Sequence, residues 1–464
     1  MNLPLDFISG MQRLLGDEYL RFASALDTPP PVSVRINPLK CCCPTKKSEP
    51  VPWLGEGAYL KERIPFTFDP LFHAGLYYVQ EASSMFVGHI LKELIKDPVS
   101  VLDLCAAPGG KTTLALSTLP EGSFVVSNEY VASRANILAE NIMKWGYTNC
   151  AVTNNTPTDY GRLQHSFDVI LVDAPCSGEG MFRKEPDALA QWSKQGVLAC
   201  ATRQKSILSN VWSALRPGGL LVYSTCTYNI TENEDIAEYL HETFGAEPLP
   251  VLDLPESWCI MPQLKGDIPF YRFMPQRTIG EGFSVTILRK PKNETYMPYK
   301  PKFKKAEKAK ITEEIKRYIQ NPKHYDYTLY NDTVFALPLE FSTNMQLLAG
   351  MNILHYGIAV ASCKGGNLQP HQSLALSSAF NSDASDSMPL SLAEARSYLR
   401  RESLTLPNIQ HGYRIVTFLG RPLGWIKCVG TRANNLYPQE WRIRSRYTPD
   451  NDNILGITLC CENY

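Results

Sequence analysis

Two cysteines and one aspartate follow apolar runs near the middle of the chain. The run Phe167–Val172 leads into Asp173-Ala-Pro-Cys176, and the run Gly219–Tyr223 leads into Ser-Thr-Cys226-Thr. If both runs are parallel strands of one open α/β sheet, their carboxyl ends bring two thiols and a carboxylate to one crevice. An activated cysteine is the residue type that covalent catalysis requires. Without further context, buried cysteines that act as small hydrophobic residues are the favoured alternative.

A glycine-rich turn follows a third apolar run, Val99–Leu104, and reads Cys105-Ala-Ala-Pro-Gly-Gly-Lys111-Thr. Small residues at a strand-to-helix turn let a ligand approach the backbone, and the next helix offers free amide groups. The spacing is neither that of a P-loop nor that of a dinucleotide-binding turn. Glu129 lies 20 residues beyond Gly109, which suits an acid that binds a ribose diol. A nucleoside-containing ligand is therefore predicted, and a tight turn without a ligand is the alternative.

The composition indicates a soluble globular protein with more than one domain. The chain has 464 residues, of which 44% are hydrophobic and 20% charged. Its 46 basic and 46 acidic residues cancel, so any nucleic-acid face must be a local patch. The first twenty residues lack the pattern of a secretory signal, and no stretch is apolar for long enough to span a membrane. Thirteen cysteines in so large a chain favour reduced thiols in a cytosolic protein.

Strands and helices alternate through the middle of the chain. Strands are expected over 99–104, 123–128, near 151, 167–173 and 219–223, helices over 82–95, 133–145 and 198–215, and a closing strand over 282–289. Before them, we expect a helix up to about residue 30, a strand over 32–38 and a loop over 41–52. This alternation is typical of a doubly wound parallel sheet, an α/β fold of the Rossmann-like kind.

The three motifs together resemble those of the RNA 5-methylcytosine methyltransferases. Leu104–Lys111 is similar to the family's S-adenosylmethionine loop, and the runs that begin at Asp173 and Ser224 are similar to its two cysteine motifs. The resemblance extends from Arg35 to Arg289 and is greatest to the bacterial RsmF-type branch of the NSUN, RsmB and RsmF superfamily. It implies a Rossmann-like class I methyltransferase domain, S-adenosylmethionine as cofactor and a cytosine of small-subunit (16S) rRNA as substrate.

The resemblance also implies a role for each residue of the crevice. Cys226 is the nucleophile that adds to carbon 6 of the cytosine, and Cys176 assists release of the methylated product. Asp173 contacts the ring, and Lys111 keeps that carboxylate ordered. The implied cofactor contacts are Cys105, Ala106, Ala107, Pro108, Gly109, Gly110, Lys111, Glu129, Asn155 and Asp173. Asn155 stands where many relatives have an aspartate near the adenine. A zinc site made of the cysteines lacks paired short-range ligands, so no metal is predicted.

RNA contacts are predicted from position and charge. A cytosine within a helix cannot reach a buried thiol, so the target must be unpaired or flipped out. Phosphates and stacking then supply most of the affinity. The candidate contacts are Arg35 and Asn37, which resemble the family's Arg-x-Asn element, together with Arg183, Lys184, Arg203 and Lys205. For the first two, a strand that merely packs on the core is the alternative.

The chain is expected to divide into four parts. These are an N-terminal α/β extension (1–75), the methyltransferase core (76–292), a linker with a small α/β domain (293–385) and a PUA-like RNA-binding β domain (386–464). The basic run 299–317 is a solvated linker or an RNA-facing patch, and 372–387 is a second linker. In the last part, arginines alternate with aromatic residues over 432–447. The aromatic side chains of that part could instead form its core.

The expected partner is rRNA or the small ribosomal subunit, in the cytoplasm. No coiled-coil pattern is present, so a monomer is the default. A tRNA substrate is one alternative to rRNA. A catalytically inactive rRNA-binding assembly factor is the other, although the intact cysteine motifs argue against it.

Overall fold

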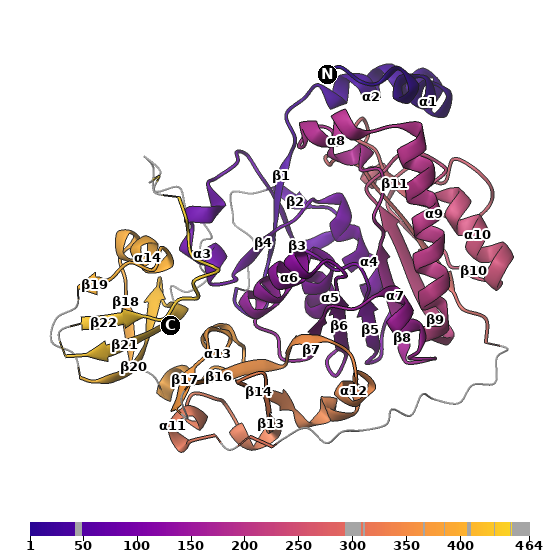
Figure 1. The fold of residues 1–464 in the computed structure, drawn as a ribbon. Helices are drawn as coiled ribbons and strands as arrows, with labels where there is room; N and C mark the ends of the chain where they lie inside the picture. Colours follow the sequence, from indigo (N-terminus) through magenta and orange to yellow (C-terminus); the bar gives the residue numbers. More distant parts are fainter. Residues whose placement is uncertain are drawn as a thin grey trace.

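The computed structural model describes most of the chain. The described residues are 1–41, 49–292, 308–309, 311–364, 367–384, 386–405, 410–430, 432–445 and 447. They form four β-sheets with helices packed around them (Figure 1). Within this part of the chain, no helix is long and apolar enough to cross a membrane. Most of the basic run 299–317 lies outside the described residues.

A nine-stranded sheet forms the centre of the molecule. In spatial order its strands are β10 (Glu247–Pro248), β12 (Phe283–Arg289), β9 (Leu215–Thr225), β8 (Phe167–Asp173), β5 (Ser100–Asp103), β6 (Phe124–Asn128), β7 (Cys150–Thr153) and β15 (Ile353–Tyr356), with β11 (Tyr271–Phe273) paired to β12. The five strands from β9 to β7 run parallel, while β12 and β15 are antiparallel to their neighbours. The predicted strands and their parallel order are confirmed.

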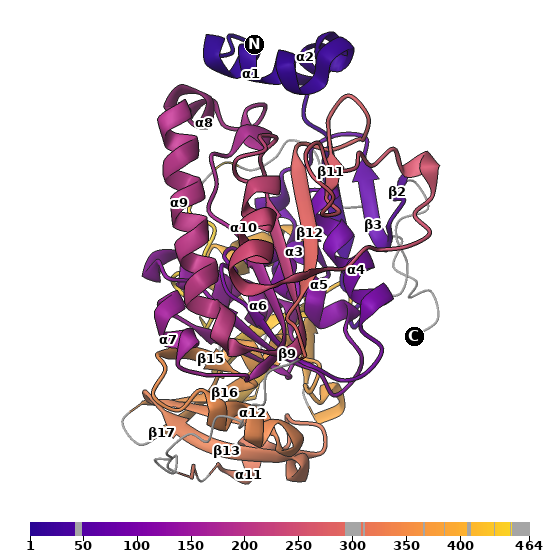
Figure 2. The ribbon, with the colours of Figure 1, turned by 90° about the vertical axis from the view of Figure 1, so that its right-hand side faces the viewer.

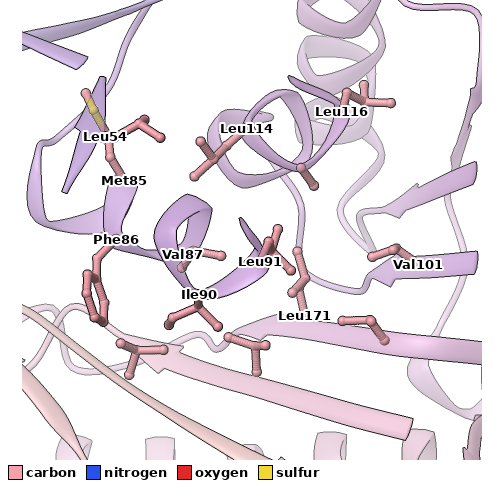
Figure 3. Packing of buried hydrophobic residues seen from close by; sticks show 14 of the residues in the cluster. Leu54, Met85, Phe86, Val87, Ile90, Leu91, Val101, Leu114, Leu116 and Leu171 are labelled. Atoms are coloured by element: carbon pink, nitrogen blue, oxygen red, sulfur yellow. The ribbon is translucent and has the colours of Figure 1, made fainter. Parts of the chain in front are cut away.

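Helices cover both faces of this sheet. One face carries α4 (Phe86–Leu94), α5 (Gly110–Thr118) and α6 (Ala132–Trp145), and the other carries α7 (Pro157–Gly161), α9 (Lys194–Val211) and α10 (Glu234–Phe244). Along β5, Val101 packs on the first face and Leu102 on the second. Figure 3 shows Leu171 and Val101 on the side of the cluster toward the sheet, with Leu91 of α4 in the same cluster. Because both faces are buried, the parallel strands are almost wholly apolar, as the sequence indicated.

The N-terminal part forms a four-stranded sheet and three helices. Its elements are α1 (Leu5–Leu15), α2 (Tyr19–Leu26), β1 (Val32–Ile36), β2 (Glu49–Val51), β3 (Leu54–Leu60), α3 (Pro70–His73) and β4 (Tyr77–Val79). The sheet order is β2-β3-β1-β4. A loop was predicted over 41–52, but β2 pairs with β3 at the sheet edge, where its proline is tolerated. The rest of that prediction, 42–48, lies outside the described residues.

Helices α1 and α2 lie at the end of the molecule toward which β8 and β9 run (Figures 1 and 2). Phe7 of α1 packs edge-on against Trp192, which follows α8 (Pro186–Gln191). Phe22 of α2 packs in the same way against Tyr228, two residues beyond Cys226. The N-terminal helices therefore border the loops that follow β8 and β9.

A second α/β unit follows the core. Its elements are α11 (Glu313–Lys316), β13 (Tyr325–Tyr330), β14 (Thr333–Pro338), α12 (Ser342–Leu347), β16 (Ile358–Lys364), β17 (Asn367–Pro370) and α13 (Gln372–Leu376). The prediction of a linker over 372–387 is wrong at its start, because α13 is fully buried. Gln372 donates through Nε2 to the carbonyl of Leu423 at 2.6 Å. The polar composition of this stretch hid the short apolar run Leu374–Leu376.

The last sheet belongs to the C-terminal part. Its elements are β18 (Ser387–Pro389), α14 (Leu392–Leu399), β19 (Leu404–Thr405), β20 (Gly412–Phe418), β21 (Arg421–Val429) and β22 (Arg432–Asn435). Trp425 and Tyr437 are buried in the cores of this region. The Tyr437 hydroxyl also lies 3.1 Å from Nδ1 of His73 in the N-terminal part. These aromatic side chains therefore pack the domain and join it to the N-terminal part.

Short 3₁₀ turns connect these elements. They are Gly16–Glu18, Phe66–Phe68, Ser83–Met85, Glu179–Met181, Trp212–Ala214, Glu256–Trp258, Pro322–His324, Leu339–Phe341 and Ser382–Ala384. Three of them replace parts of predicted helices. The helix predicted from residue 82 begins as the turn Ser83–Met85, and the N-terminal helix is divided by Gly16–Glu18. The helix predicted over 198–215 ends as the turn Trp212–Ala214.

A buried ion pair joins β11 to α10. Arg272 and Glu234 have side chains that are 0% and 1% exposed. Nε of Arg272 donates to Oε1 of Glu234 at 2.8 Å, and Nη1 donates to the carbonyl of Tyr228 at 2.7 Å. The pair thus fixes both strand and helix to the loop that follows β9.

We predict that Arg272→Ala lowers the free energy of unfolding by about 3 to 5 kcal/mol, because it leaves the Glu234 carboxylate buried without its cation. Urea unfolding followed by circular dichroism measures this change. Lys265→Ala is the control, since Lys265 is exposed where it pairs with Asp235 and Glu238, and it should leave the midpoint nearly unchanged. Equal midpoints for the two variants would contradict the prediction.

Candidate active site

The structure brings the two cysteines into contact. Cys176 follows β8 and Cys226 follows β9, and these neighbouring parallel strands are in register, with Asp173 opposite Ser224. The two Sγ atoms lie 3.3 Å apart, and both residues are partly exposed. Both are free cysteines that form no disulfide bond. The strand ends therefore form the crevice of thiols and carboxylate that the sequence suggested.

Asp173 and Lys111 form an ion pair beside the thiols. Nζ of Lys111 lies 2.7 Å from Oδ2 of Asp173, while Ser224 donates through Oγ to Oδ1 at 2.9 Å. Burial is the largest single influence on the pKa of Lys111 and acts to lower it. The charge and hydrogen bond of Asp173, together with the charges of Asp103 and Cys226, outweigh burial and raise that pKa overall. Lys111 is thus a fixed cation within electrostatic reach of Asp173 and Cys226.

The environment of Cys176 favours its protonated form. Its hydrogen bond with Cys226, followed by burial, raises the pKa of the Cys176 thiol well above its usual value. A protonated Cys176 can donate its hydrogen to the sulfur of Cys226, 3.3 Å away. The geometry therefore provides one sulfur that holds a proton next to a sulfur that can receive it.

The glycine-rich turn links β5 to α5. Gly109 has φ +115°, and a Cβ there would lie 3.3 Å from Cδ1 of Leu138. No side chain of the described residues caps the N-terminus of α5, which leaves backbone amides open. The turn is held at its start by a hydrogen bond from the amide of Ala106 to the carbonyl of Asn128, at 2.8 Å. It can therefore present open backbone amides to a ligand.

Asp103 is a site residue that the sequence reasoning missed. Its Oδ2 accepts a hydrogen bond from Thr112 at 2.6 Å, but its Oδ1 is buried without a partner among the described residues. Burial raises the pKa of Asp103 to about 7. An acid at the end of the strand before the turn was the available signal. An unsatisfied buried oxygen next to open backbone amides fits a bound polar ligand.

Glu129 stands at the end of β6, as predicted. Its carboxylate accepts from the amide of Val131 at 2.9 Å and lies 3.3 Å from Nη1 of Arg134. The residue is 5% exposed. Its carboxylate is therefore fixed in position at the end of β6, the strand beside β5 and the glycine-rich turn, and this suits binding of a ribose diol.

Asn155 is paired with the backbone of Asn352. Its Nδ2 donates to the carbonyl of Asn352 at 3.1 Å, and its Oδ1 accepts from the amide of Asn352 at 3.0 Å. Asn352 directly precedes β15. In this arrangement both polar atoms of the Asn155 side chain are used within the protein, and its contact with a cofactor stays a prediction.

Arg35 and Asn37 are both buried, and Arg35 donates through Nη2 to the carbonyl of Gly110 in the glycine-rich turn at 3.3 Å. Arg35 is 1% exposed, and its guanidinium bonds to Gln80 and lies 4.6 Å from the ring of Trp145. Asn37 is buried and donates through Nδ2 to the carbonyls of Gly75 and Trp145, both at 2.9 Å. These contacts match the alternative of a strand that packs on the core, and a role in RNA binding stays a prediction.

The other basic candidates differ in accessibility. The Arg183 side chain is 5% exposed and pairs through Nε with Glu281 at 2.7 Å. Lys184 is partly exposed and lies 3.5 Å from the same carboxylate. Arg203 and Lys205 lie on α9, the first exposed and the second partly buried with its Nζ over the ring of Tyr239. Arg183 therefore serves a buried ion pair, while the other three remain reachable from solvent.

Three family models match this chain. The model for 16S rRNA methyltransferase RsmB/F matches residues 91–289. The model for the N-terminal domain of 16S rRNA methyltransferase RsmF matches 3–82, and that for the methyltransferase RsmF PUA domain matches 385–443.

Curated relatives match along nearly the whole chain. Three named ribosomal RNA small subunit methyltransferase F come from Shewanella sp. (strain W3-18-1), Erwinia tasmaniensis and Salmonella paratyphi A. They are 32%, 31% and 34% identical to this chain. The matches cover 90%, 94% and 90% of this chain, and 92%, 96% and 92% of the relatives.

Solved structures share the fold of the core. A methyltransferase homolog protein from Pyrococcus horikoshii is 28% identical, with a TM-score of 0.52 over 61% of this chain and 94% of that one. NSun6 from the same organism is 20% identical and has a TM-score of 0.53 over 62% of this chain and 98% of that one, a likeness of fold alone. The predicted fold class is confirmed.

Asp103 predicts a pH-dependent stability of the ligand-free protein. Its pKa rises from 3.8 to about 7 on folding, chiefly through burial, so the folded protein holds a proton that the unfolded chain releases. This contribution to stability is fully present below pH 3.8 and is lost as the pH rises through about 7.

The urea midpoint of the wild type should therefore fall, relative to that of Asp103→Asn, as the pH is raised from about 5 to about 8. The amide of the variant does not titrate, which makes it the reference at each pH. Parallel midpoint curves for the two proteins would contradict the shift.

Proposed function

Because the chain belongs to the RsmB/F family of 16S rRNA methyltransferases, we propose that it methylates carbon 5 of a cytosine in 16S rRNA. S-adenosylmethionine is the methyl donor of this family. The observation that carries the proposal is the contact of the Cys176 and Cys226 sulfurs, 3.3 Å apart, beside the ion pair of Asp173 and Lys111. Methylation of cytosine carbon 5 through a covalent adduct needs a nucleophilic sulfur and a second group to assist release.

The turn and its neighbours fit S-adenosylmethionine. The open amides of α5 and the unpaired Oδ1 of Asp103 suit polar groups of the donor, and the carboxylate of Glu129 suits its ribose diol. The residues that would hold it are the predicted ones from Cys105 to Lys111, with Glu129, Asp173 and the added Asp103. When bound, this cofactor supplies an electrophilic methyl group.

Cys226 forms the covalent adduct in this proposal. Carbon 5 of cytosine is a poor nucleophile, but addition of a thiolate to carbon 6 shifts the ring electrons toward carbon 5. Asp173 holds the side of the ring that carries nitrogen 3 and stabilises its protonated form. Lys111 keeps that carboxylate in place, since its Nζ lies 2.7 Å away.

Cys176 acts in the second half of the reaction. After carbon 5 has been methylated, its proton must leave and the carbon 6 to sulfur bond must break. The Cys176 thiol, whose contact with Cys226 raises its pKa, can donate a proton to the departing sulfur, and the Cys176 thiolate that results can accept the proton from carbon 5. Without that proton donor, the adduct should persist.

RNA binding is proposed for two regions. Lys184, Arg203 and Lys205 are accessible cations on the loop and helix that follow the Cys176 motif. The PUA match at 385–443 supports an RNA-binding role for the predicted C-terminal domain, 386–464. The predicted division at 75 and 292 stays a proposal, since the match to the N-terminal domain runs to 82 and the match to the core covers 91–289. With bacterial rRNA as substrate, the enzyme would work in the cytoplasm, as a monomer.

We predict opposite consequences for the two cysteines. Cys226→Ala should lower methyl transfer by roughly a thousandfold or more, because no adduct can form. Cys176→Ala should form the adduct and fail to release it, which leaves a protein–RNA complex that survives denaturing electrophoresis. Cys259→Ala, at an exposed thiol in another loop, is the control and should turn over normally. Full activity of Cys226→Ala, or normal turnover of Cys176→Ala without an adduct, would sink the assignment.

The substrate is tested by transfer of a radiolabelled methyl group to three RNAs. Purified small subunits and naked 16S rRNA should accept label at carbon 5 of cytosine, whereas tRNA should not. Label on tRNA alone would favour the tRNA alternative. Transfer to none of them, with RNA binding intact, would favour an inactive assembly factor.

A further inference from the structure

Two buried glutamates lie on the loops that carry the cysteines. Glu179 follows Cys176 by three residues, and Glu232 follows Cys226 by six. The two glutamates are 1% and 0% exposed, and neither has a basic partner within salt-bridge distance among the described residues. Burying two carboxylates without cations is costly unless hydrogen-bond donors surround them. The hydrogen-bond donors around each carboxylate therefore show which parts of the chain Glu179 and Glu232 hold in place.

Glu179 reaches from the Cys176 loop to the loop after Cys226. Its Oε2 accepts from Oγ1 of Thr227 at 2.5 Å and from the amides of Tyr228 and Asn229 at 2.7 and 3.0 Å. Its Oε1 accepts from Nδ2 of Asn229 and from Nε1 of Trp192, both at 3.1 Å. One side chain thus binds the three residues that directly follow the Cys226 thiol.

Glu232 reaches in the opposite direction. Its Oε2 accepts from the amide of Ser177, the residue after Cys176, and from Nε2 of Gln204, both at 2.9 Å. Its Oε1 accepts from the Ser177 hydroxyl and from Nδ2 of Asn229 at 2.8 Å. Each loop is therefore held by a carboxylate that belongs to the other loop.

The backbone completes this connection. The amide of Gly180 donates to the carbonyl of Cys226 at 2.9 Å, and the hydroxyls of Ser177 and Thr227 lie 3.2 Å apart. A Cβ at Gly180 would lie 2.7 Å from the carbonyl oxygen of Gly282, so the Cys176 loop is also in close backbone contact with the segment before β12. The side-chain hydrogen bonds between the loops begin at Ser177 and Thr227, one residue after each cysteine. They are well placed to fix the distance between the two sulfur atoms.

We propose that Glu179 and Glu232, here named the carboxylate clasp, are positioning residues that hold the Cys176 and Cys226 thiols in contact. All four carboxylate oxygens accept hydrogen bonds from the protein and both side chains are buried, so the clasp acts through the cysteines and does not touch the RNA. The effect of the clasp on methyl transfer rests on the proposed function. The effect of the clasp on the distance between the two thiols is independent of that function.

The charge of the clasp matters because its surroundings are all donors. A glutamine at 179 has one acceptor oxygen. In either orientation of the amide, its amino group would face N–H groups that cannot accept a hydrogen bond: those of Trp192 and the Asn229 side chain, or the backbone amides of Tyr228 and Asn229. Charge-assisted hydrogen bonds are also stronger than neutral ones. Glu179→Gln therefore keeps the volume of the side chain and releases one side of the clasp.

Thiol contact can be measured without RNA or cofactor. Phenylarsine oxide joins two neighbouring thiols through two arsenic–sulfur bonds and releases water. Peptide mapping by mass spectrometry then shows whether the Cys176 and Cys226 peptides are joined, apart from other cysteines. In Glu179→Gln, we expect this joining to be at least about tenfold slower than in the full-length wild type, because the supporting contacts are lost. Asp69→Asn is the control, since Asp69 is an equally buried carboxylate that bonds Leu71 and Tyr77 in the N-terminal part.

The same variant separates positioning from general loss of structure. kcat for methyl transfer should fall by about a hundredfold, while KM for S-adenosylmethionine stays within about twofold of the wild type. Slower joining together with this kinetic split supports the clasp. Joining at the wild-type rate in Glu179→Gln would overturn it, whatever happens to activity.

A second pair of variants covers the case in which Glu179→Gln does not fold. Thr227→Val removes the hydroxyl that bonds Glu179, and Thr227→Ser keeps it. Joining should be slowed in the first and restored in the second, and equal rates would overturn the proposal. If the wild-type thiols join readily and the variants do not, but the wild type methylates no RNA, the clasp stands and the proposed function fails.

Discussion

The in-register parallel pairing of β8 and β9 is the constraint on which the site depends. Asp173 lies opposite Ser224 in the ladder, so the two loops leave the sheet at the same level and meet immediately. A shift of one residue would turn the side chains of one strand to the opposite face of the sheet. Ile170 and Leu171 pack in different cores, so that shift would exchange side chains between two close-packed interiors and disturb the fit in both. Hydrophobic burial thus fixes where the polar chemistry takes place.

Much of this arrangement could be predicted from the sequence, because parallel strands buried on both faces are apolar throughout and end in recognisable motifs. Glu129 could be placed by its spacing alone. The polar residues that serve the fold could not be placed in this way. Arg35, Asn37 and Arg183 are cations or amides whose type suggests RNA, but the groups to which they donate hydrogen bonds lie 38 to 158 residues away in the chain. Only the folded structure shows that these side chains form hydrogen bonds within the protein.

The same limit applies to contacts between parts of the chain that are far apart in sequence. Asn155 stands where a cofactor contact was expected, yet its partner Asn352 comes from a unit nearly 200 residues downstream. Gln372 begins a stretch of linker-like composition, yet it is buried against Leu423. The composition of a segment indicates how much apolar surface that segment can bury. It does not indicate which of its polar residues are buried by contact with a distant segment.

The addition of β15 to the edge of the central sheet has a consequence for the independence of the parts. β15 pairs with β7 through Thr153, Val152 and Ala151, so the unit after the core supplies the outer strand of the core sheet. A chain that ended at Arg289 would leave the backbone of β7 open, and an uncovered edge is a template for association with other chains. By covering the edge of β7, the unit that follows the core therefore also protects the central sheet from pairing with other chains, and this effect does not depend on RNA.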